Sequence, residues 1–195
     1  SVILPVFFLL LIGLVAVYIA TSNDYPGTIA KVMTQQGVWI FLGCVVAFVV
    51  MLFSTEFLWK VTPYLYALGL ALMILPLIFY SPELVESTGA KNWVTIGSVT
   101  LFQPSEFMKV SYILMLARAS IWFRHKVPED NLKNDWKLLG IFALITLPVM
   151  VLLGLQKDLG TAMVFSAILA GLILLSGISW WIILPVVIAV AVIIG

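Results

Sequence analysis

The sequence predicts an all-α protein, a polytopic transmembrane helical bundle, and three observations lead to this fold class. Apolar residues make up 63% of the 195 positions, charged residues make up only 10%, and the mean hydropathy is +1.19. Ordinary soluble domains are about 45–50% apolar and about 25% charged. A soluble chain of this length has too much surface for its volume to bury so many apolar side chains. The composition therefore excludes a soluble globular domain, a disordered chain and a secreted disulfide-linked scaffold.

The apolar residues gather in seven runs, which we expect to be seven membrane spans. A helix needs about 20 apolar residues to cross the hydrocarbon layer, and its backbone must satisfy its own hydrogen bonds there. The runs are apolar all round, whereas barrel strands alternate apolar and polar residues. The first run lacks the basic residues of a signal peptide, so we expect it to be a true span. The runs are 2–20, 37–53, 63–80, 104–123, 138–155, 161–175 and 180–195.

The segment 81–103, between the third and fourth runs, is expected to hold a small extracellular hairpin. Gly97 and Ser98 lie between two triplets rich in β-forming residues, 94–96 and 99–101, a pattern typical of a tight turn between short strands. Trp93 stands just before the first triplet. It has two interpretations, as one more residue of the interfacial aromatic belt or as a side chain lying against a groove.

Loop cations predict the orientation of the spans, because cytoplasmic loops carry an excess of Lys and Arg. The segment 118–137 holds five of them, which places it in the cytoplasm together with the N-terminus. The segments 21–36 and 81–103 then lie outside. Six cations fall on the inner side and three on the outer side. The inner ones are Lys60, Arg118, Arg124, Lys126, Lys133 and Lys137, and the outer ones are Lys31, Lys91 and Lys157.

We expect residues 1–195 to form a single integral-membrane domain that is part of a larger protein. The chain starts at Ser1 without an initiator Met, and it stops at Gly195 inside an apolar run. A net charge of +1 predicts no nucleic-acid partner. The only cysteine, Cys44, allows no internal disulfide, and the only histidine, His125, has a cation on each side, which makes it a poor metal ligand. No metal site and no cofactor are predicted, and dependence on a divalent cation is left open.

Charged residues inside a span are candidates for function, because each costs about 2.5–3.5 kcal/mol on insertion scales. The fourth run begins with Gln103, Pro104 and Ser105, followed by Glu106 and then Lys109. Glu106 and Lys109 are three residues apart, so they share a helix face and can form a pair. The alternative is structural: a carboxylate that favours the helix start, with a lysine that reaches back to the headgroups.

A second polar group separates the fifth and sixth runs, where Asp158 precedes Gly160 and Thr161. Asp158 can contribute to a functional site, or it can simply cap the sixth helix. By the orientation above, Trp93, Glu106, Lys109 and Asp158 all lie at the depth of the outer leaflet. We therefore predict a polar cavity that opens outward between the fourth, fifth and sixth spans.

These places carry a resemblance to a known family. Gly89-Ala90-Lys91-Asn92-Trp93, then Phe102-Gln103-Pro104-Ser105-Glu106 with Lys109, then Asp158-Leu159-Gly160-Thr161 resemble the motifs of the SEDS family in order and spacing. The resemblance covers the whole chain and is strongest to the RodA branch of Gram-positive cocci. It implies a protein of about ten spans in the bacterial cytoplasmic membrane. It also implies a peptidoglycan glycosyltransferase that polymerises lipid II at the outer face during cell elongation and shape maintenance, with a class B penicillin-binding protein as partner.

The resemblance also implies which residues are functional. Trp93, Gln103, Ser105, Glu106, Lys109 and Asp158 would contact the substrate. The carboxylate usually assigned as catalytic in the family lies in an outer loop after the seventh span. We therefore expect no catalytic residue within 1–195, with Asp158 a candidate helper, and no activity from this part alone. Two positions depart from the family: Lys157, where Pro is common, and Asn92, where Arg is common.

Two other functions remain open at the level of the sequence. One is a lipid II flippase or another transporter, whose site would lie near the midplane between inverted repeats. The charges here cluster toward the outer side, and residues 1–100 show no repeat in 101–195. The other is a membrane scaffold that activates a penicillin-binding protein without catalysing a reaction.

Overall fold

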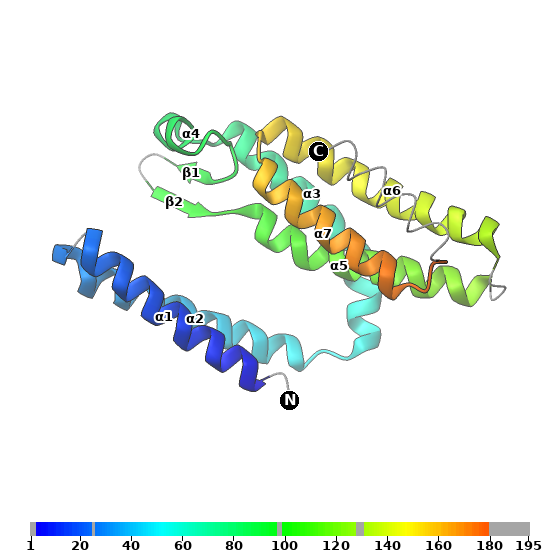
Figure 1. The fold of residues 1–195 in the computed structure, drawn as a ribbon, viewed down its shortest axis with the longest axis horizontal. Coiled ribbons are helices and arrows are strands. Elements are labelled where there is room, and N and C mark those ends of the chain that lie inside the picture. The colour runs from blue at the N-terminus through cyan, green and yellow to red at the C-terminus, as the bar shows by residue number, and fades with distance from the viewer. Residues whose placement is uncertain (1–2, 25, 97–98, 128–130, 180–195) are drawn as a thin grey trace. The chain divides into compact units, whose positions relative to one another are not determined.

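The computed structural model describes residues 3–24, 26–96, 99–127 and 131–179 (Figure 1). As predicted, this part of the chain is helical apart from one small hairpin. It divides into two compact units, Ser1–Thr55 and Glu56–Gly195; the prediction of a single domain remains a prediction. The elements are α1 (Ile3–Asp24), the 3-10 turn η1 (Pro26–Thr28), α2 (Ile29–Met51), α3 (Thr55–Ile78), α4 (Pro82–Thr88), β1 (Val94–Ile96), β2 (Val99–Phe102), α5 (Pro104–Lys126), α6 (Leu132–Gln156) and α7 (Leu159–Leu175).

The first six predicted spans correspond to helices α1, α2, α3, α5, α6 and α7. Four of them, α1, α2, α3 and α6, are long and apolar enough to cross a membrane by length and composition, and α7 is a shorter apolar helix. The helix α5 carries charged residues at both ends and in its middle. The seventh run, 180–195, lies outside the described residues. The helical membrane class is therefore confirmed for the part of the chain that the structure describes.

Several helices begin earlier than the apolar runs predicted. The helix α2 starts at Ile29 rather than 37, α3 at Thr55 rather than 63, and α6 at Leu132 rather than 138. An apolar run marks only the part of a helix that fits the hydrocarbon layer, whereas backbone hydrogen bonds continue into the polar flanks. The segment 21–36 is thus mostly helical, and the segment 54–62 is largely the first two turns of α3.

In the first unit, α1 and α2 pack against each other around the short turn η1. Large apolar side chains are exposed along both helices, and α2 has no buried residue. Such faces are expected of helices surrounded by lipid, because a soluble protein rarely exposes so large an apolar surface.

The second unit is a bundle in which α3, α5, α6 and α7 share a buried apolar core. Met108 and Tyr112 of α5 lie at its centre, and the ring of Tyr112 is 5.1 Å from that of Phe165 on α7. Gly69 allows α5 to approach α3 closely, since a Cβ at this position would lie 2.5 Å from the sulfur of Met108. These contacts fix the relative positions of the helices that carry the predicted site.

Three prolines lie inside helices of this bundle: Pro63 and Pro76 in α3, and Pro148 in α6. An interior proline removes one helical hydrogen bond and disturbs the carbonyls three and four residues before it. In lipid there is no bulk water to pair with those carbonyls, and a side chain of a neighbouring helix can supply the donor instead. For each proline, such a side chain donates to a carbonyl three or four residues before the proline. Arg118 of α5 donates to the Trp59 carbonyl, Gln156 of α6 to the Met73 carbonyl, and Tyr66 of α3 to the Ile145 carbonyl.

The hairpin, the short helix α4 and the loop 89–93 lie at one end of the second unit, beside the start of α5 and the α6–α7 turn (Figure 1). The strands β1 and β2 are antiparallel, with Ile96 opposite Val99, which confirms the predicted hairpin; residues 97–98 lie outside the described residues. The helix α4 was not predicted. Its signals are Pro82 at the first helical position and Gly89, which ends the helix with φ 74°, a region that favours glycine.

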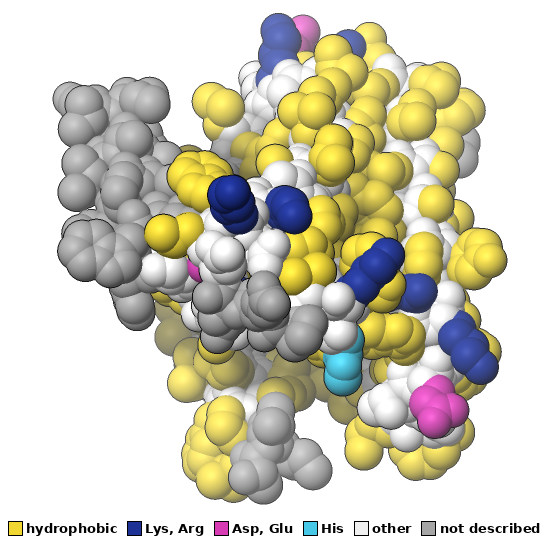
Figure 2. Space-filling view, turned by 90° about the vertical axis from the view of Figure 1, so that its right-hand side faces the viewer, with side chains coloured by type: hydrophobic (Ala, Val, Ile, Leu, Met, Phe, Trp, Pro, Cys, Tyr) yellow, Lys and Arg dark blue, Asp and Glu magenta, His cyan; other side chains and the backbone are white. Residues whose placement is uncertain are grey.

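The opposite end of the second unit gathers cations around the α5–α6 connection. Arg124 of α5 pairs with the buried Asp135 of α6 at 2.9 Å. Figure 2 shows Lys, Arg and His side chains among apolar ones on this side. Arg118 is not a loop charge as the orientation count assumed. It lies within α5, where its guanidinium is held against the backbone and ring of Trp59.

Candidate functional site

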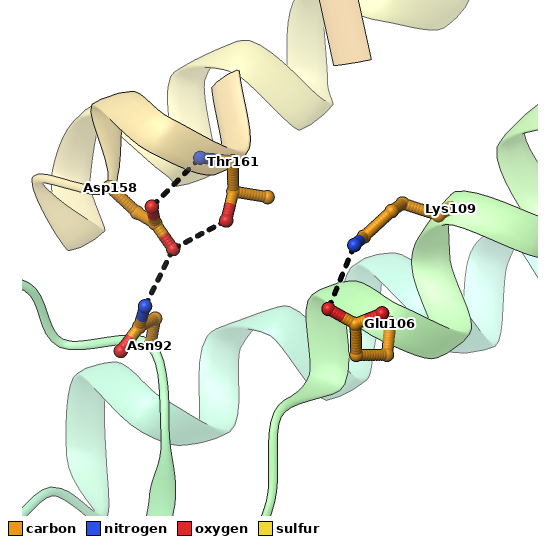
Figure 3. A network of polar contacts seen from close by, with 5 residues as sticks. All are labelled: Asn92, Glu106, Lys109, Asp158 and Thr161. Atoms are coloured by element: carbon orange, nitrogen blue, oxygen red, sulfur yellow. Dashed lines mark hydrogen bonds and ion pairs between the residues drawn. The ribbon is translucent and has the colours of Figure 1, made fainter. Parts of the chain in front are cut away.

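Asp158 lies at the start of α7, where its carboxylate accepts three hydrogen bonds (Figure 3). Thr161 donates its backbone N–H to Oδ1 at 3.0 Å and its hydroxyl to Oδ2 at 2.8 Å. Asn92 donates its side-chain Nδ2 to Oδ2, also at 2.8 Å. The residue is only 7% exposed. Capping of the sixth predicted helix is thus confirmed, and the same carboxylate also joins α7 to the loop 89–93.

The turn before Asp158 has a defined hydrogen-bond pattern. The N–H of Asp158 bonds to the Leu153 carbonyl at 3.0 Å, and that of Lys157 to the Gly154 carbonyl at 3.1 Å, which together form a Schellman motif. Lys157 has φ 58°, a left-handed conformation usually taken by glycine. Proline, whose φ is fixed at about −65°, cannot adopt it. The turn of this chain therefore differs in backbone conformation from one with proline at this position.

The loop 89–93 is fastened to the α6–α7 turn at two neighbouring residues. Lys91 donates its N–H to the Gln156 carbonyl at 2.8 Å, and Asn92 binds Asp158 as described. The side chain of Lys91 lies over the ring of Tyr80, 4.0 Å from its centre. The other end of the Asn92 amide, Oδ1, is buried and has no hydrogen-bond partner among the described residues. The loop, which ends with Trp93, is therefore held at a fixed place beside the hairpin.

Glu106 and Lys109 form the predicted ion pair on the first turns of α5, with 2.8 Å between Oε1 and Nζ. The Lys109 side chain is 26% exposed and that of Glu106 is 63% exposed. In the described network no hydrogen bond or ion pair joins this pair to Asp158 (Figure 3). The structure thus forms two polar groups at one end of the bundle rather than a single cluster.

The remaining predicted site residues differ in accessibility. Trp93 is 38% exposed and can meet a ligand directly. Gln103 is half-buried just before α5, where its carbonyl accepts the N–H of Glu106 at 3.1 Å. Ser105 is buried, and its hydroxyl has no hydrogen-bond partner in the described part of the chain. A ligand can therefore reach Trp93 and the Glu106–Lys109 pair, whereas Ser105 and Asp158 lie behind the surface.

The two polar groups suit different chemistry. An ammonium group has three donors, and Glu106 takes one of those of Lys109, so two remain for an anion. A carboxylate has about four acceptor sites, and three are used at Asp158, so Asp158 is suited to holding the loop. Within the described residues, no three His, Cys, Asp or Glu side chains lie together as a metal site requires.

The sequence-based site omitted two residues that the structure joins to Asp158. Thr161 follows Asp158 by three residues, the spacing at which a backbone N–H of the first helical turn meets the side chain of the capping residue. The sequence therefore contained a signal for the contact between Thr161 and Asp158. Asn92 is 66 positions away from Asp158. No local pattern links the two, and only the packing of the loop against α7 brings them together.

Comparison with known proteins gives relatives over most of this chain. The chain is 31% identical over 172 residues to the probable peptidoglycan glycosyltransferase FtsW of Nitrosococcus halophilus, which covers 88% of the chain and 41% of that protein. It is 30% identical over 166 residues to the peptidoglycan glycosyltransferase RodA of Treponema pallidum, with 85% and 36% covered. It is 35% identical over 131 residues to the peptidoglycan glycosyltransferase MrdB of Escherichia coli (strain K12), with 66% and 32% covered. The chain thus spans less than half the length of these relatives.

A solved structure supports the same relationship. It describes the structural coordination of polymerization and crosslinking by a peptidoglycan synthase complex, and one of its chains matches with a TM-score of 0.69 and 27% identity. The match covers 96% of this chain and 52% of that one. With its apolar helices and these relatives, the chain is a multi-pass protein of the cytoplasmic membrane. The model of the FtsW/RodA/SpoVE cell cycle proteins matches residues 1–195, and the chain therefore belongs to this family, the SEDS family that its motifs resemble.

Proposed function

We propose that the whole protein is a peptidoglycan glycosyltransferase that polymerises lipid II at the outer face of the bacterial cytoplasmic membrane. The relatives RodA and MrdB are named peptidoglycan glycosyltransferases, and the relative FtsW is named a probable one. The observation that carries the proposal from this chain is the Glu106–Lys109 pair at the start of α5. It offers a partly exposed cation with two donors that the Glu106 contact leaves unused, at the same end of a lipid-embedded bundle as the exposed Trp93.

The substrate explains this combination of groups. Lipid II has a polyprenyl tail, a pyrophosphate and a disaccharide-peptide. The tail requires an apolar helix surface, and the pyrophosphate requires a cation at headgroup depth. Glu106 orients Lys109 toward such an anion, and charge-assisted hydrogen bonds of this kind are the strong ones. We assign direct substrate contacts to Trp93, Gln103, Glu106 and Lys109. The buried Ser105 supports the start of α5 from behind the surface, and Asp158 holds the loop that presents Trp93.

The chemical step needs a general base near the acceptor hydroxyl. The donors around Asp158 and its burial suit it poorly to that task. We therefore place the catalytic carboxylate in the outer loop that the family carries after the seventh span, as the family resemblance implies. The proposal includes no cofactor held by residues 1–195.

We also propose a class B penicillin-binding protein as the partner that cross-links the new strands. The solved structure with the similar chain is that of a complex that coordinates polymerization and crosslinking. The finer assignment to the RodA branch of Gram-positive cocci stays a proposal, since relatives named FtsW and RodA match at 31% and 30% identity. Complementation separates the branches: a RodA-type protein restores elongation to a strain depleted of RodA and does not restore division to one depleted of FtsW.

The proposed orientation places the N-terminus and the α5–α6 connection in the cytoplasm and the loop 89–93 outside. Cations of α5 and α6 at that connection support it, because positive residues favour the cytoplasmic side. Single cysteines replacing Trp93 and Lys133 test it in intact spheroplasts with a membrane-impermeant maleimide. Labelling at Trp93 and protection at Lys133 is expected, and the reverse pattern would invert the orientation.

The decisive experiment uses the full-length protein, purified with its penicillin-binding partner and given lipid II in detergent, where flipping is impossible. We expect glycan polymer that persists when the partner carries no glycosyltransferase activity. Lys109→Ala should lower polymerisation at least about tenfold, in line with a lost charge-assisted contact. Lys133→Ala, which removes an exposed lysine at the other end of the bundle, serves as the matched control. No polymer, together with movement of lipid II across sealed vesicles, would favour a flippase instead.

A further inference from the structure

Gln156, the last residue of α6, belongs to neither polar group of the site, yet it contacts two other parts of the bundle. Its side chain is buried, with the residue only 1% exposed, and its Nε2 donates to the Met73 carbonyl of α3 at 2.6 Å. Its backbone carbonyl accepts the N–H of Lys91 at 2.8 Å. We propose that Gln156 is a positioning residue that sets the place of the loop 89–93 relative to α3; its catalytic consequence rests on the proposed function.

The carbonyl of Met73 lies in the turn of α3 that Pro76 disturbs. Pro76 follows three residues later, and an interior proline opens the helix on the side of the carbonyls that precede it. Both Met73 and Pro76 are fully buried. A carbonyl whose helical bond is weakened at such a place is costly to leave without a further donor. The amide of Gln156 is the group that reaches it, so the end of α6 is fixed at the bend of α3.

The backbone carbonyl of Gln156 can bind the loop because it lies at the end of α6. The last carbonyls of a helix have no partner within the helix, and the Schellman turn uses those of Leu153 and Gly154. The carbonyl of Gln156 therefore accepts from Lys91. Two residues later, Asp158 binds Asn92. A turn of three residues thus holds two consecutive loop residues, and its own place depends on the Gln156 side chain.

The consequence for the proposed reaction concerns substrate binding rather than the reacting atoms. The loop presents Trp93, which is exposed, whereas the catalytic carboxylate is placed outside residues 1–195. Loss of the Gln156 donor should therefore let the loop open and raise KM for lipid II several-fold, with kcat nearly unchanged. A residue that only stabilised the fold would lower the amount of active protein and leave KM as it was.

The first test does not depend on activity. In the full-length protein with native cysteines replaced, cysteine is introduced at Ala90 in the loop or at Ala119 in α5, which are both 9% exposed. Gln156→Met keeps the length of the side chain and removes the donor. It should speed maleimide labelling at Ala90 about fivefold, the effect expected of one lost buried hydrogen bond, with labelling at Ala119 unchanged. Equal rates at Ala90 with and without Gln156→Met would overturn the proposal, as would equal acceleration at both sites.

The second test asks whether Pro76 is the reason for the contact. Pro76→Ala restores an N–H that bonds to the Leu72 carbonyl, so the turn of α3 that contains the Met73 carbonyl closes to a regular helix. In that background Gln156→Met should change Ala90 labelling less than twofold, and the two substitutions should be non-additive. An undiminished effect would show that Gln156 acts independently of the bend.

Lipid II kinetics complete the design. A several-fold rise in KM with a kcat within about twofold is expected for Gln156→Met, and restored labelling and KM are expected in the double variant with Pro76→Ala. A fall in kcat alone would refute the role in positioning for binding. If the wild-type protein made no polymer, the proposed function would fail, and the labelling results would still decide the role of Gln156.

Discussion

Replacing Asp158 by Asn and by Ala distinguishes a carboxylate that acts by its charge from one that holds the loop. Asp158→Ala removes the acceptor of all three hydrogen bonds, which leaves the Thr161 N–H and the Asn92 amide without it. Asp158→Asn keeps an oxygen for the Thr161 N–H. The Asn92 amide can then turn over, because its Oδ1 has no partner among the described residues and can accept from the new amide.

The geometry gives a magnitude for each variant. A lost helix cap costs about 1 kcal/mol, and a buried amide left unpaired costs about 1–3 kcal/mol, so Asp158→Ala should lose about 3 kcal/mol of unfolding free energy. Asp158→Asn exchanges one satisfied arrangement for another and should lose about 1 kcal/mol or less. For a protein more than twice the length of this chain, each kcal/mol corresponds to about 1–2 °C. We therefore expect losses in Tm of about 5 °C for Ala and about 1–2 °C for Asn.

The assay is thermal unfolding of the full-length protein in detergent, followed by polymerisation of lipid II well below both midpoints. Asp158→Asn should retain most of the polymerase activity, whereas Asp158→Ala should lose most of it with the loop. Asp135→Asn is the matched control, since Asp135 is also a buried carboxylate but lies at the other end of the bundle. Equal losses of Tm in the two Asp158 variants would refute the three-donor geometry. Equal loss of activity despite unequal Tm would show that the charge itself is required.

Three further substitutions test the backbone and packing. Lys157→Gly should raise the Tm of the full-length protein by about 1–2 °C, since φ 58° costs a side chain about 1 kcal/mol, whereas Lys157→Pro should lower it; the opposite order would contradict the left-handed turn. Gly69→Ala should cost about 1–3 kcal/mol because its Cβ meets Met108, while Gly140→Ala, with open space around it, should not destabilise α6. Arg118→Leu should cost about 1–3 kcal/mol by leaving the Trp59 carbonyl unpaired, and an unchanged unfolding midpoint would refute that contact.

The features that the sequence predicted correctly are local. The apolar runs identified six helices, the β-rich triplets identified the hairpin, and spacings of three residues identified the Glu106–Lys109 pair and the Asp158 cap. In each case the interacting groups lie within one or two turns, so the geometry of a helix or a turn decides the contact without knowledge of the fold.

The features that it missed depend on packing between distant segments. The Asn92–Asp158 bond joins residues 66 positions apart, and the Gln156–Met73 bond joins residues 83 positions apart. Neither side chain has a neighbour in sequence that indicates its partner. The prolines were a partial signal, because the carbonyls before an interior proline in lipid need another donor, but the apolar run that begins at Pro63 placed this proline at a helix start rather than inside α3.

Arg118 shows how a contact between distant segments changes the membrane orientation that the count of loop cations predicts. The count of loop cations treats every Lys and Arg alike, yet a guanidinium bound to the Trp59 carbonyl inside the bundle does not mark a side of the membrane. The exposed cations are the better measure, because they face the charged surface that the positive-inside rule reflects. Among the described residues, exposed Lys side chains on the proposed inner side are Lys60, Lys126, Lys133 and Lys137, and those on the proposed outer side are Lys31 and Lys157. The bias toward the inner side thus persists without Arg118, and it continues to support a loop 89–93 that faces outward.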